Sequence, residues 1–357
     1  MKRIVQLCFG APGKGGPATA LAKFLDASNV EYAVVWQERA AGGISIRQIW
    51  SMARQIRRHR PALVHVRGLG NEGFHGVLAA RLGGAGKILL SIHGTQRDLQ
   101  SGNGGLRRFV VINILEPLSI KLADRITTVC EFTARRRFLD RYRSKLVAPI
   151  PNGVPLPDTA TLALRNPTRA SMGIGESELV FVAVSRLSVE KGYDDLAQAS
   201  AQAATQGVKG HIVIVGDGPD RRCIETAFAT VHGLKVHFVG HQDDVRPYLR
   251  AADVFVFPTW HENLSNALIE ALAHGLPTIA TDVGGNTEVL YRGGGLLVPV
   301  RNPAALANAM VALSADARLR SQLATQAVAN VAVHYSLTAM VQAWESLYEH
   351  LIAGREK

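Results

Sequence analysis

Glu262 and Glu270, eight positions apart, are the residues of this sequence best suited to act together on one ligand. Glu262 follows a short apolar segment, and Glu270 lies in an apolar run that predicts a buried helix capped by Ser265 or Asn266. The N-terminus of such a helix favours a phosphate, because its unpaired N–H groups carry a positive partial charge. At roughly 1.5 Å per residue along the axis, the two carboxylates could bind sugar and ribose hydroxyls on either side of a diphosphate.

Two cations, Arg186 and Lys191, follow an expected strand at 179–184 and precede a helical stretch. Ligands of parallel α/β sheets bind at the carboxyl ends of the strands. At that edge Arg can bind a diphosphate bidentately, and Lys can supply a point charge. A surface ion pair with Glu190 or Asp194 is the alternative use of these two cations.

His93 closes another expected strand, at 88–92, and precedes Gly94. At the carboxyl end of a strand it could hydrogen-bond a substrate hydroxyl or support charge in a transition state. A structural histidine with satisfied hydrogen bonds is the alternative interpretation. We expect that simpler role for His65, along with His75 and His241.

Two glycine-rich turns resemble phosphate-binding loops but lack their spacing. In residues 10–16, Gly10 lies too close to Lys14, and neither Ser nor Thr follows that lysine, as a Walker-type loop requires. In residues 216–218, Arg221 occupies the place of the third glycine of the dinucleotide fingerprint. We expect both turns, and a third at Gly284-Gly285, to be loops that let backbone amides approach a ligand.

Short apolar segments alternate with helical stretches along the whole chain, which predicts parallel sheets covered on both faces. The segment 151–167 is rich in Pro and Asn and fits a linker between two such halves. The fold class is therefore expected to be α/β, with two doubly wound, Rossmann-like domains facing across a ligand-binding cleft. The expected strands are 4–8, 32–36, 63–66, 88–92, 126–129 and 146–150 in the first half, and 179–184, 211–215, 236–239, 254–257, 278–281 and 296–300 in the second.

The length of 357 residues suits two domains, and 47% hydrophobic residues can form substantial cores. The three cysteines form no metal-type pair, which indicates a reducing compartment without structural disulfides or zinc. We expect neither a signal peptide nor a membrane-spanning segment, because no apolar stretch is long enough. No Asp-x-Asp cluster is present to hold a divalent metal, so we expect no metal and no cofactor.

The net charge of +11 is unevenly distributed. Residues 1–157 carry 24 Lys and Arg against 9 Asp and Glu, a net +15, whereas residues 158–357 carry a net −4. A basic half attracts anionic lipid, nucleic acid or phosphorylated substrates. Nucleic acid is disfavoured, because no stacking aromatics are interleaved with the arginines. An ordinary solvated surface remains the alternative.

Taken together, these residues resemble glycosyltransferase family 4, the retaining GT-B enzymes that use nucleotide-sugar donors. The resemblance covers almost the whole chain. The motifs that carry it are Gly15-Gly16, residues 91–94 around His93, Pro151-Asn152-Gly153, residues 185–192, residues 215–219, and the ordered set of 251–258, Glu262, Glu270, 275–277, 284–285 and Glu288.

The resemblance implies a role for each residue of the site. Arg186 and Lys191 bind the donor diphosphate, and Glu270 binds the ribose hydroxyls. The transferred sugar is held by Glu262 and by the amides that follow it, and His93 contacts the same sugar. Gly16 approaches the phosphate or the acceptor. The family usually has glycine and proline where this sequence has Asn263 and Ser265. The implied catalytic residues are His93, Glu262, Arg186 and Lys191, and the implied donor-binding residues are Gly16, Arg186, Lys191, Glu262, Asn263, Leu264, Ser265 and Glu270.

The resemblance further implies an acceptor-binding domain at 1–152, a donor-binding domain at 153–336, and a final helix, 337–357, that packs on the first domain. The implied reaction is metal-independent, retaining transfer of a hexose or N-acetylhexosamine from a UDP-sugar, with a GDP-sugar as the alternative. The expected acceptor is a lipid-linked glycan or a polysaccharide of the bacterial cell surface. The expected location is the cytoplasm, peripheral on the anionic inner face of the membrane, with no nucleic-acid partner.

Three alternatives make different predictions. A glycoside hydrolase would hydrolyse glycosides without any nucleotide. It is disfavoured, because Glu262 and Glu270 lie around a helix terminus rather than facing each other across a glycosidic bond. A sugar-nucleotide epimerase of the same architecture would convert the donor without any acceptor. A non-catalytic protein that binds a nucleotide sugar or a membrane would bind without turnover.

Overall fold

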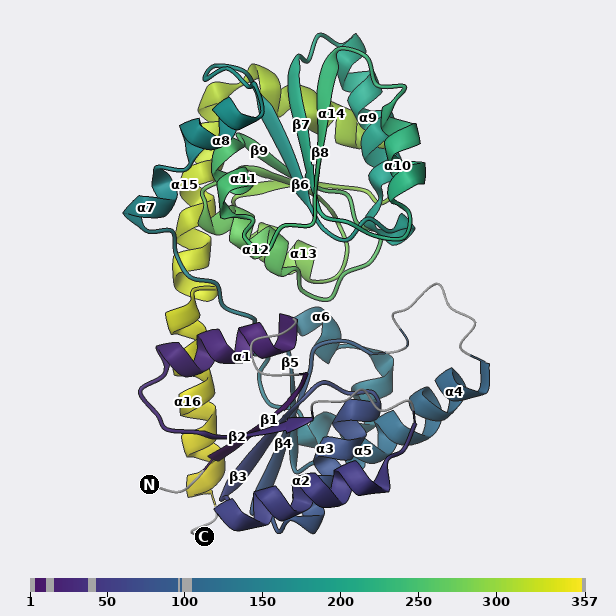
Figure 1. Ribbon diagram of the computed structural model, residues 1–357, viewed down its shortest axis with the longest axis vertical. Coiled ribbons are helices and arrows are strands. Elements are labelled where there is room, and N and C mark those ends of the chain that lie inside the picture. The colour runs from purple at the N-terminus through teal and green to yellow at the C-terminus, as the bar shows by residue number, and fades with distance from the viewer. Residues whose placement is uncertain (1–3, 11–15, 38–42, 96, 98–104, 355–357) are drawn as a thin grey trace. The chain divides into compact units, whose positions relative to one another are not determined.

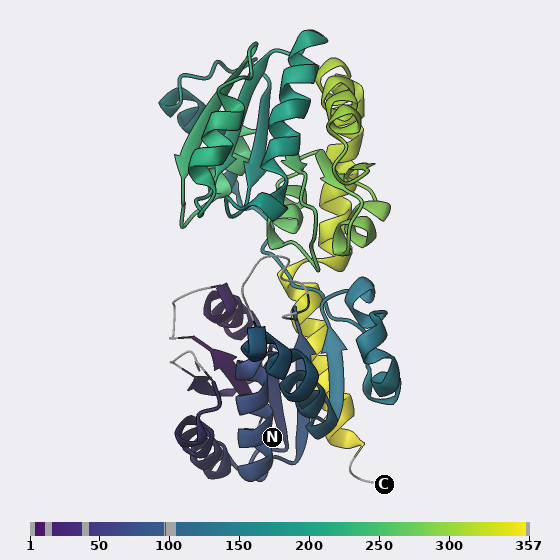
Figure 2. The ribbon, with the colours of Figure 1, turned by 90° about the vertical axis from the view of Figure 1, so that its right-hand side faces the viewer.

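The computed structural model describes residues 4–10, 16–37, 43–95, 97 and 105–354. The chain forms two compact units. Unit 1 comprises Met1–Asn152 and Leu337–Lys357, and unit 2 comprises Gly153–Ser336 (Figures 1 and 2). The chain therefore passes from unit 1 to unit 2 after Asn152 and returns after Ser336.

Unit 1 is built on a five-stranded sheet with the order β2-β1-β3-β4-β5, in which every pairing is parallel. Near-continuous runs of buried apolar residues form these strands because helices cover both faces of the sheet. The strands are β1 (Ile4–Phe9), β2 (Ala33–Gln37), β3 (Leu63–Arg67), β4 (Lys87–Ile92) and β5 (Arg125–Thr128).

Two helical layers cover the sheet of unit 1 (Figure 1). One core cluster joins α2, α3 and α5 to one face, and another joins α1 and α16 to the opposite face. A π-helical turn, Val111–Leu115, links α4 to α5, and a 3₁₀ segment, Arg137–Lys145, follows α6. The helices are α1 (Gly16–Ala27), α2 (Ile46–His59), α3 (Asn71–Leu82), α4 (Gly105–Val110), α5 (Glu116–Leu122), α6 (Glu131–Ala134) and α16 (Leu337–Ala353).

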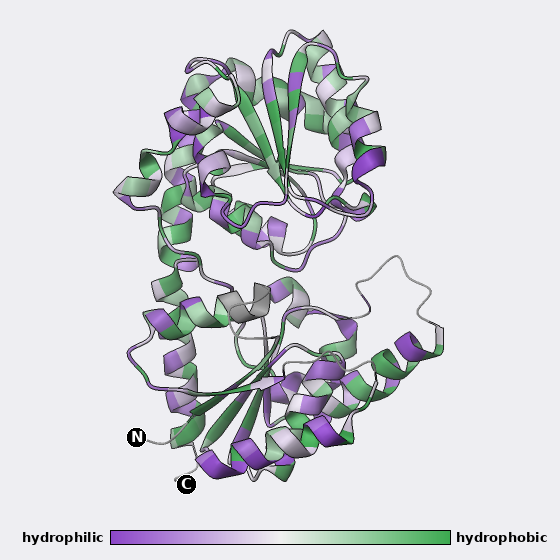
Figure 3. Cartoon of the chain, viewed as in Figure 1, coloured by the Kyte–Doolittle hydropathy of each residue, from purple (hydrophilic) through white to green (hydrophobic). Residues whose placement is uncertain are grey.

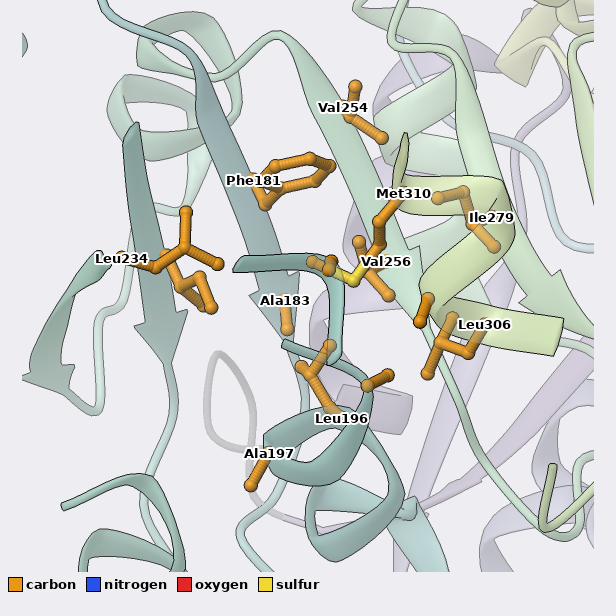
Figure 4. Packing of buried hydrophobic residues seen from close by; sticks show 14 of the residues in the cluster. Phe181, Ala183, Leu196, Ala197, Leu234, Val254, Val256, Ile279, Leu306 and Met310 are labelled. Atoms are coloured by element: carbon orange, nitrogen blue, oxygen red, sulfur yellow. The ribbon is translucent and has the colours of Figure 1, made fainter. Parts of the chain in front are cut away.

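Unit 2 is built on a six-stranded parallel sheet with the order β11-β10-β9-β6-β7-β8. The central strands of this sheet are apolar (Figure 3), and the sheet packs against α9 and α14 in one continuous core (Figure 4). The strands are β6 (Val180–Val184), β7 (Gly210–Val215), β8 (Leu234–Gly240), β9 (Val254–Phe257), β10 (Thr278–Thr281) and β11 (Gly295–Val298). The helices are α7 (Thr159–Leu162), α8 (Arg165–Ser171), α9 (Tyr193–Thr205), α10 (Arg221–Phe228), α11 (Arg246–Ala251), α12 (Asn266–Ala273), α13 (Gly285–Tyr291), α14 (Pro303–Ala315) and α15 (Ala317–His334).

Two parallel, helix-covered sheets confirm the predicted α/β class with two Rossmann-like halves. Two local predictions are wrong. Residues 146–150 form only an isolated bridge, Leu146 to Ile126, because Pro149 has no N–H with which to continue a ladder. The expected linker at 151–167 contains α7 and the start of α8, because Asp158 caps α7 by accepting the Thr161 N–H.

Among the described residues, none of the helices combines the length and the apolar character needed to cross a membrane. All three cysteines are free, with Cys8 and Cys130 buried and Cys223 exposed.

Candidate active site

In unit 2, loops from adjacent strands meet at the carboxyl edge of the sheet. The loop after β6 leads through a 3₁₀ turn, Val189–Lys191, into Gly192 and α9. Gly192 has a φ of 72°, and a Cβ there would lie 2.0 Å from the carbonyl oxygen of Pro258. Only glycine therefore allows the loop after β6 to contact the loop after β9 this closely.

The glycine-rich turn after β7, residues 216–218, packs against the loop after β6. The N–H of Leu187 donates to the Asp217 carbonyl at 3.0 Å, and the N–H of Asp220 donates to the Leu187 carbonyl at 3.1 Å. The N–H of Gly218 donates to the Asp217 carboxylate at 2.7 Å. The backbone of this glycine-rich turn is therefore in close contact with the loop after β6.

Trp260 anchors the loop after β9 onto α9. Its indole N–H donates to the Asp195 carboxylate at 2.6 Å, and its backbone N–H donates to the Glu190 carbonyl at 2.8 Å. On the indole ring lies the guanidinium of Arg301, 4.2 Å from the ring centroid. A cation over an indole face is the strongest form of this interaction, so the loop is held from both sides.

Lys191 and Glu262 form an ion pair where these loops meet. The Lys191 Nζ lies 2.9 Å from Glu262 Oε2, and each side chain is 20% exposed. The same Nζ lies 5.6 Å from the ring centroid of Phe257. The pair joins the loop after β6 to the loop after β9, whereas the sequence suggested Glu190 or Asp194 as the ion-pair alternative for Lys191. In the structure Glu190 instead accepts a hydrogen bond from the Ser188 hydroxyl at 2.7 Å.

Arg186 is exposed at the end of β6, and no hydrogen bond or ion pair joins its guanidinium to the described residues. The charge of Arg186 nevertheless contributes to lowering the pKa of Glu190, which lies below its ordinary value. Burial raises that pKa, but the hydrogen bond from Ser188 and the charges of Lys191 and Arg186 outweigh it. Arg186 and Lys191 thus both follow β6 on the loop that carries Glu190.

Helix α12 begins beside Glu262, as the sequence predicted. Ser265 is its N-cap, and the serine oxygen accepts the Leu268 N–H at 3.2 Å. Asn263, Leu264 and Ser265 are all buried. The Glu262 carboxylate accepts the N–H of Asn263 at 3.2 Å, so it is fixed at the entrance to the helix.

Two further contacts complete this region. The N–H of Gly285 donates to the Asn263 carbonyl at 2.8 Å, and a Cβ on Gly285 would lie 2.1 Å from that oxygen. The glycine pair at the start of α13, Gly284 and Gly285, therefore supports the loop that carries Glu262. Glu270 lies in the second half of α12 and is partly exposed.

His93 and Gly16 belong to unit 1. His93 follows β4, and its Nε2 lies 3.2 Å from the Ser91 Oγ. Burial and the charge of Arg67 lower the pKa of His93 from 6.5 to about 4, so the ring is neutral near pH 7. Gly16 is the first residue of α1, and Gly15 lies outside the described residues.

All the sequence-predicted donor-site residues except Gly16 and His93 therefore belong to unit 2. Direct contacts join Lys191 to Glu262 and Glu262 to Asn263, whereas Arg186 and Glu270 lie on the loop after β6 and on α12. Within the described part of the chain, no cluster of three or more His, Cys, Asp or Glu side chains is arranged to hold a metal ion.

Comparison with known proteins identifies the chain. Residues 7–157 match the sequence family described as Glycosyltransferase Family 4, and residues 178–316 match the family described as Glycosyl transferases group 1. The chain belongs to glycosyltransferase family 4.

Similar proteins agree with this assignment. This family 4 glycosyltransferase is 27% identical over 266 residues to N-acetyl-alpha-D-glucosaminyl L-malate synthase of Bacillus anthracis, covering 73% of this chain and 67% of that one. It is 25% identical over 285 residues to UDP-Gal:alpha-D-GlcNAc-diphosphoundecaprenol alpha-1,3-galactosyltransferase of Escherichia coli, covering 76% and 71%. The Anabaena protein HepE, solved in complex with UDP-glucose, superimposes with a TM-score of 0.73 over 98% of this chain and 100% of that one, at 17% identity.

The fold is therefore GT-B, and the protein is a retaining glycosyltransferase that transfers sugar from a nucleotide sugar. Sequence reasoning missed the part played by Trp260, Asp195 and Arg301 in holding the loop after β9. The available signal was Trp260, two residues before Glu262, because a large aromatic side chain in a polar loop usually packs against a neighbouring element.

Proposed function

We propose that this glycosyltransferase moves a hexose or N-acetylhexosamine from a UDP-sugar to a lipid-linked or polysaccharide acceptor in bacterial cell-surface glycan synthesis. The acceptor oxygen replaces the diphosphate oxygen on the same face of the anomeric carbon. Unit 2 binds the donor, and unit 1 binds the acceptor.

The observation that carries this proposal is the Lys191–Glu262 pair beside the capped N-terminus of α12, with Arg186 exposed nearby. As the bond to the diphosphate breaks, negative charge grows on the leaving group. Lys191, Arg186 and the helix N-terminus supply positive charge that is already in place, so they stabilise the leaving group without a reorganisation energy during the reaction. Glu262 is then positioned to accept hydrogen bonds from hydroxyls of the transferred sugar.

The rest of the donor is assigned to α12 and the loop before it. Glu270 accepts hydrogen bonds from the ribose hydroxyls, and the amides of residues 263–265 contact the sugar. Because the Ser265 oxygen caps α12, its hydroxyl serves the helix that faces the diphosphate. The departure from the usual proline at this position is therefore compatible with donor binding.

His93 contacts the transferred sugar as a neutral hydrogen-bonding group. Its low pKa, caused first by burial and then by Arg67, makes a positively charged acid a poor description of its role at neutral pH. Gly16, at the start of α1, approaches the phosphate or the acceptor.

The choice of UDP and of a lipid-linked acceptor draws on the relatives. The Escherichia coli galactosyltransferase is named for a UDP donor and a diphosphoundecaprenol acceptor, and HepE was solved with UDP-glucose. A GDP-sugar is the alternative donor.

An anionic membrane surface is the proposed location of the acceptor. Residues 1–157 carry a net charge of +15. In the segment that starts at α4, Leu106 is 79% exposed, Phe109 60% and Ile114 51%, and Arg107 and Arg108 lie between the first two. Exposed apolar side chains flanked by arginines suit the boundary between acyl chains and anionic headgroups.

The test is a panel of UDP-, GDP- and ADP-sugars, each incubated with and without a lipid-diphosphate-linked sugar, with release of the nucleoside diphosphate measured. We expect release from a UDP-sugar only when the acceptor is present. Conversion of the donor without acceptor indicates an epimerase, and binding without turnover on any acceptor indicates a non-catalytic protein. Exclusive use of a GDP-sugar overturns the choice of uridine.

A further inference from the structure

A line of buried polar side chains crosses the face of the unit 1 sheet that α1 and α16 cover. Side chains alternate between faces along a strand, so Gln6, His65 and Ser91 share this face with apolar Ile4, Leu63 and Leu89. Gln6 and His65 are opposite each other in the β1–β3 register, and both are 0% exposed. Buried polar groups destabilise a fold unless they are hydrogen-bonded, so this line requires partners.

The partners form one continuous chain of hydrogen bonds that ends at His93. Its other end is Arg67, whose guanidinium lies 5.5 Å from the ring centroids of both Phe24 and Trp344. The contacts are Arg67 Nη2 to Gln6 Oε1 at 3.3 Å, Gln6 Nε2 to Tyr348 OH at 3.0 Å, Tyr348 OH to His65 Nδ1 at 2.7 Å, His65 Nε2 to Ser91 Oγ at 3.0 Å, and Ser91 Oγ to His93 Nε2 at 3.2 Å.

Arg67 determines the direction of this chain. A guanidinium can only donate, so the Gln6 amide must turn its oxygen toward Arg67 and its NH₂ toward Tyr348. The Tyr348 oxygen therefore accepts from Gln6. Among the described residues, the Tyr348 hydroxyl contacts the Gln6 NH₂, which can only donate, and His65 Nδ1, so the buried Tyr348 proton is satisfied by donation to His65 Nδ1.

The same reasoning extends to His93. Burial, reinforced by the charge of Arg67, holds the pKa of His65 well below 6.5, so the ring is neutral and has one N–H. Because His65 Nδ1 accepts, its proton lies on Nε2 and is donated to Ser91. Ser91 then donates its own proton to His93 Nε2. A neutral His93 is left with its proton on Nδ1.

We propose that Tyr348 is a positioning residue that acts through His65 and Ser91 to fix His93 as the Nδ1–H tautomer and to hold its ring orientation. His93 then presents one defined hydrogen-bond donor to the transferred sugar, and this half of the inference rests on the role of His93 in the proposed function. Tyr348 belongs to α16, so in this proposal the C-terminal helix that packs on the sheet also determines the tautomer of a site histidine.

Tyr348→Phe isolates the hydroxyl, because the ring that packs on Trp344 at 5.8 Å and Tyr32 at 6.1 Å remains. Tyr32→Phe is the matched control, since the Tyr32 hydroxyl contacts Ser28 rather than His65. Ser91→Ala breaks the chain next to His93. The full-length chain carries each change, and thermal unfolding checks that each variant is folded.

The first readout is a long-range ¹H–¹⁵N correlation spectrum of protein labelled in the histidine rings, with His93 assigned from a His93→Gln sample. We expect wild type and Tyr32→Phe to show a protonated Nδ1 on His93. Tyr348→Phe and Ser91→Ala should both populate the Nε2–H form. An unchanged His93 signal in both variants overturns the relay and leaves the proposed function intact.

The second readout is kcat and donor KM in the transfer assay. We expect kcat to fall about tenfold in Ser91→Ala and about threefold to tenfold in Tyr348→Phe, as loss of one net hydrogen bond commonly causes, with donor KM nearly unchanged. The double variant should be no slower than Ser91→Ala, because both changes interrupt one chain. If the losses in activation free energy of the two single variants add in the double variant, the two residues act independently, and the relay from Tyr348 through Ser91 to His93 is overturned. A changed tautomer with unchanged kcat overturns the catalytic half of the inference together with the assigned role of His93.

Discussion

Replacing Lys191 with alanine should slow transfer by about 100- to 1000-fold, as removal of one preorganised electrostatic group commonly does. The Lys191 side chain is 20% exposed and its ammonium lies 2.9 Å from the Glu262 carboxylate, so the charge is partly shielded from water. At an effective dielectric constant of about 20, a unit charge 4 Å from a phosphate charge interacts by about 4 kcal/mol. That energy corresponds to roughly a thousandfold in rate and sets the upper end of the range.

The loss should appear mainly in kcat, because the charge on the diphosphate grows as the glycosidic bond breaks. In Lys191→Ala the Glu262 carboxylate also loses its cation and repels the leaving group. Lys191→Ala combined with Glu262→Gln removes that repulsion, so we expect the double variant to lose less than the two single losses combined.

The assay is the initial rate of UDP release at saturating acceptor over a range of donor concentrations, with thermal unfolding as the check on folding. Lys209→Ala is the matched control, because Lys209 is exposed and precedes β7 at the opposite edge of the same sheet. We expect Lys209→Ala to behave as wild type. A loss below tenfold in a folded Lys191→Ala protein refutes the reasoning.

Three further predictions concern stability and location. Burial and Arg67 lower the pKa of His93 in the folded protein to about 4, against an ordinary value of 6.5. The contribution of His93 to the free energy of unfolding should therefore be constant above pH 6.5 and decrease as the pH falls toward 4, by about 2 kcal/mol at pH 5. Urea unfolding of His93→Gln should show a flatter pH dependence than wild type. Trp344→Ala should destabilise the protein by about 3–5 kcal/mol, because this α16 side chain is 2% exposed, whereas Gln342→Ala on the exposed side of the helix should leave the unfolding midpoint unchanged. Neutralising Arg135, Arg136 and Arg137 together should weaken binding to anionic vesicles by about 3 kcal/mol, or roughly 150-fold, at about 1 kcal/mol per arginine. Equal co-sedimentation with anionic and neutral vesicles contradicts a membrane-facing basic surface.

The features that could be predicted from the sequence are those that depend on residues adjacent in the chain. The N-cap at Ser265 follows from a short polar residue placed before an apolar run, and α12 begins there. Strand positions follow from apolar segments separated by helices, except at 146–150, where Pro149 interrupts the pairing. These signals are local, so no knowledge of the strand order is needed to interpret them.

Contacts between distant residues could not be predicted in the same way. The Lys191–Glu262 pair exists because β9 is the neighbour of β6 in the sheet, although two strands separate them in the sequence. His65 was expected to be an ordinary structural histidine, and it is indeed buried and hydrogen-bonded. Its connection to His93 depends on the registers of β1, β3 and β4 and on Tyr348 from the other end of the chain.

The central claim, that the loops around α12 in unit 2 form the nucleotide-sugar site, is tested most directly by calorimetric titration of UDP into wild type, Glu270→Ala and His93→Ala. We predict that wild type binds UDP more tightly than GDP or ADP. Glu270→Ala should weaken UDP binding, because ribose contacts are made in the ground state, and His93→Ala should leave it unchanged. Binding of UDP that Glu270→Ala leaves unaltered, or that His93→Ala abolishes, contradicts the assignment of the donor nucleotide to unit 2.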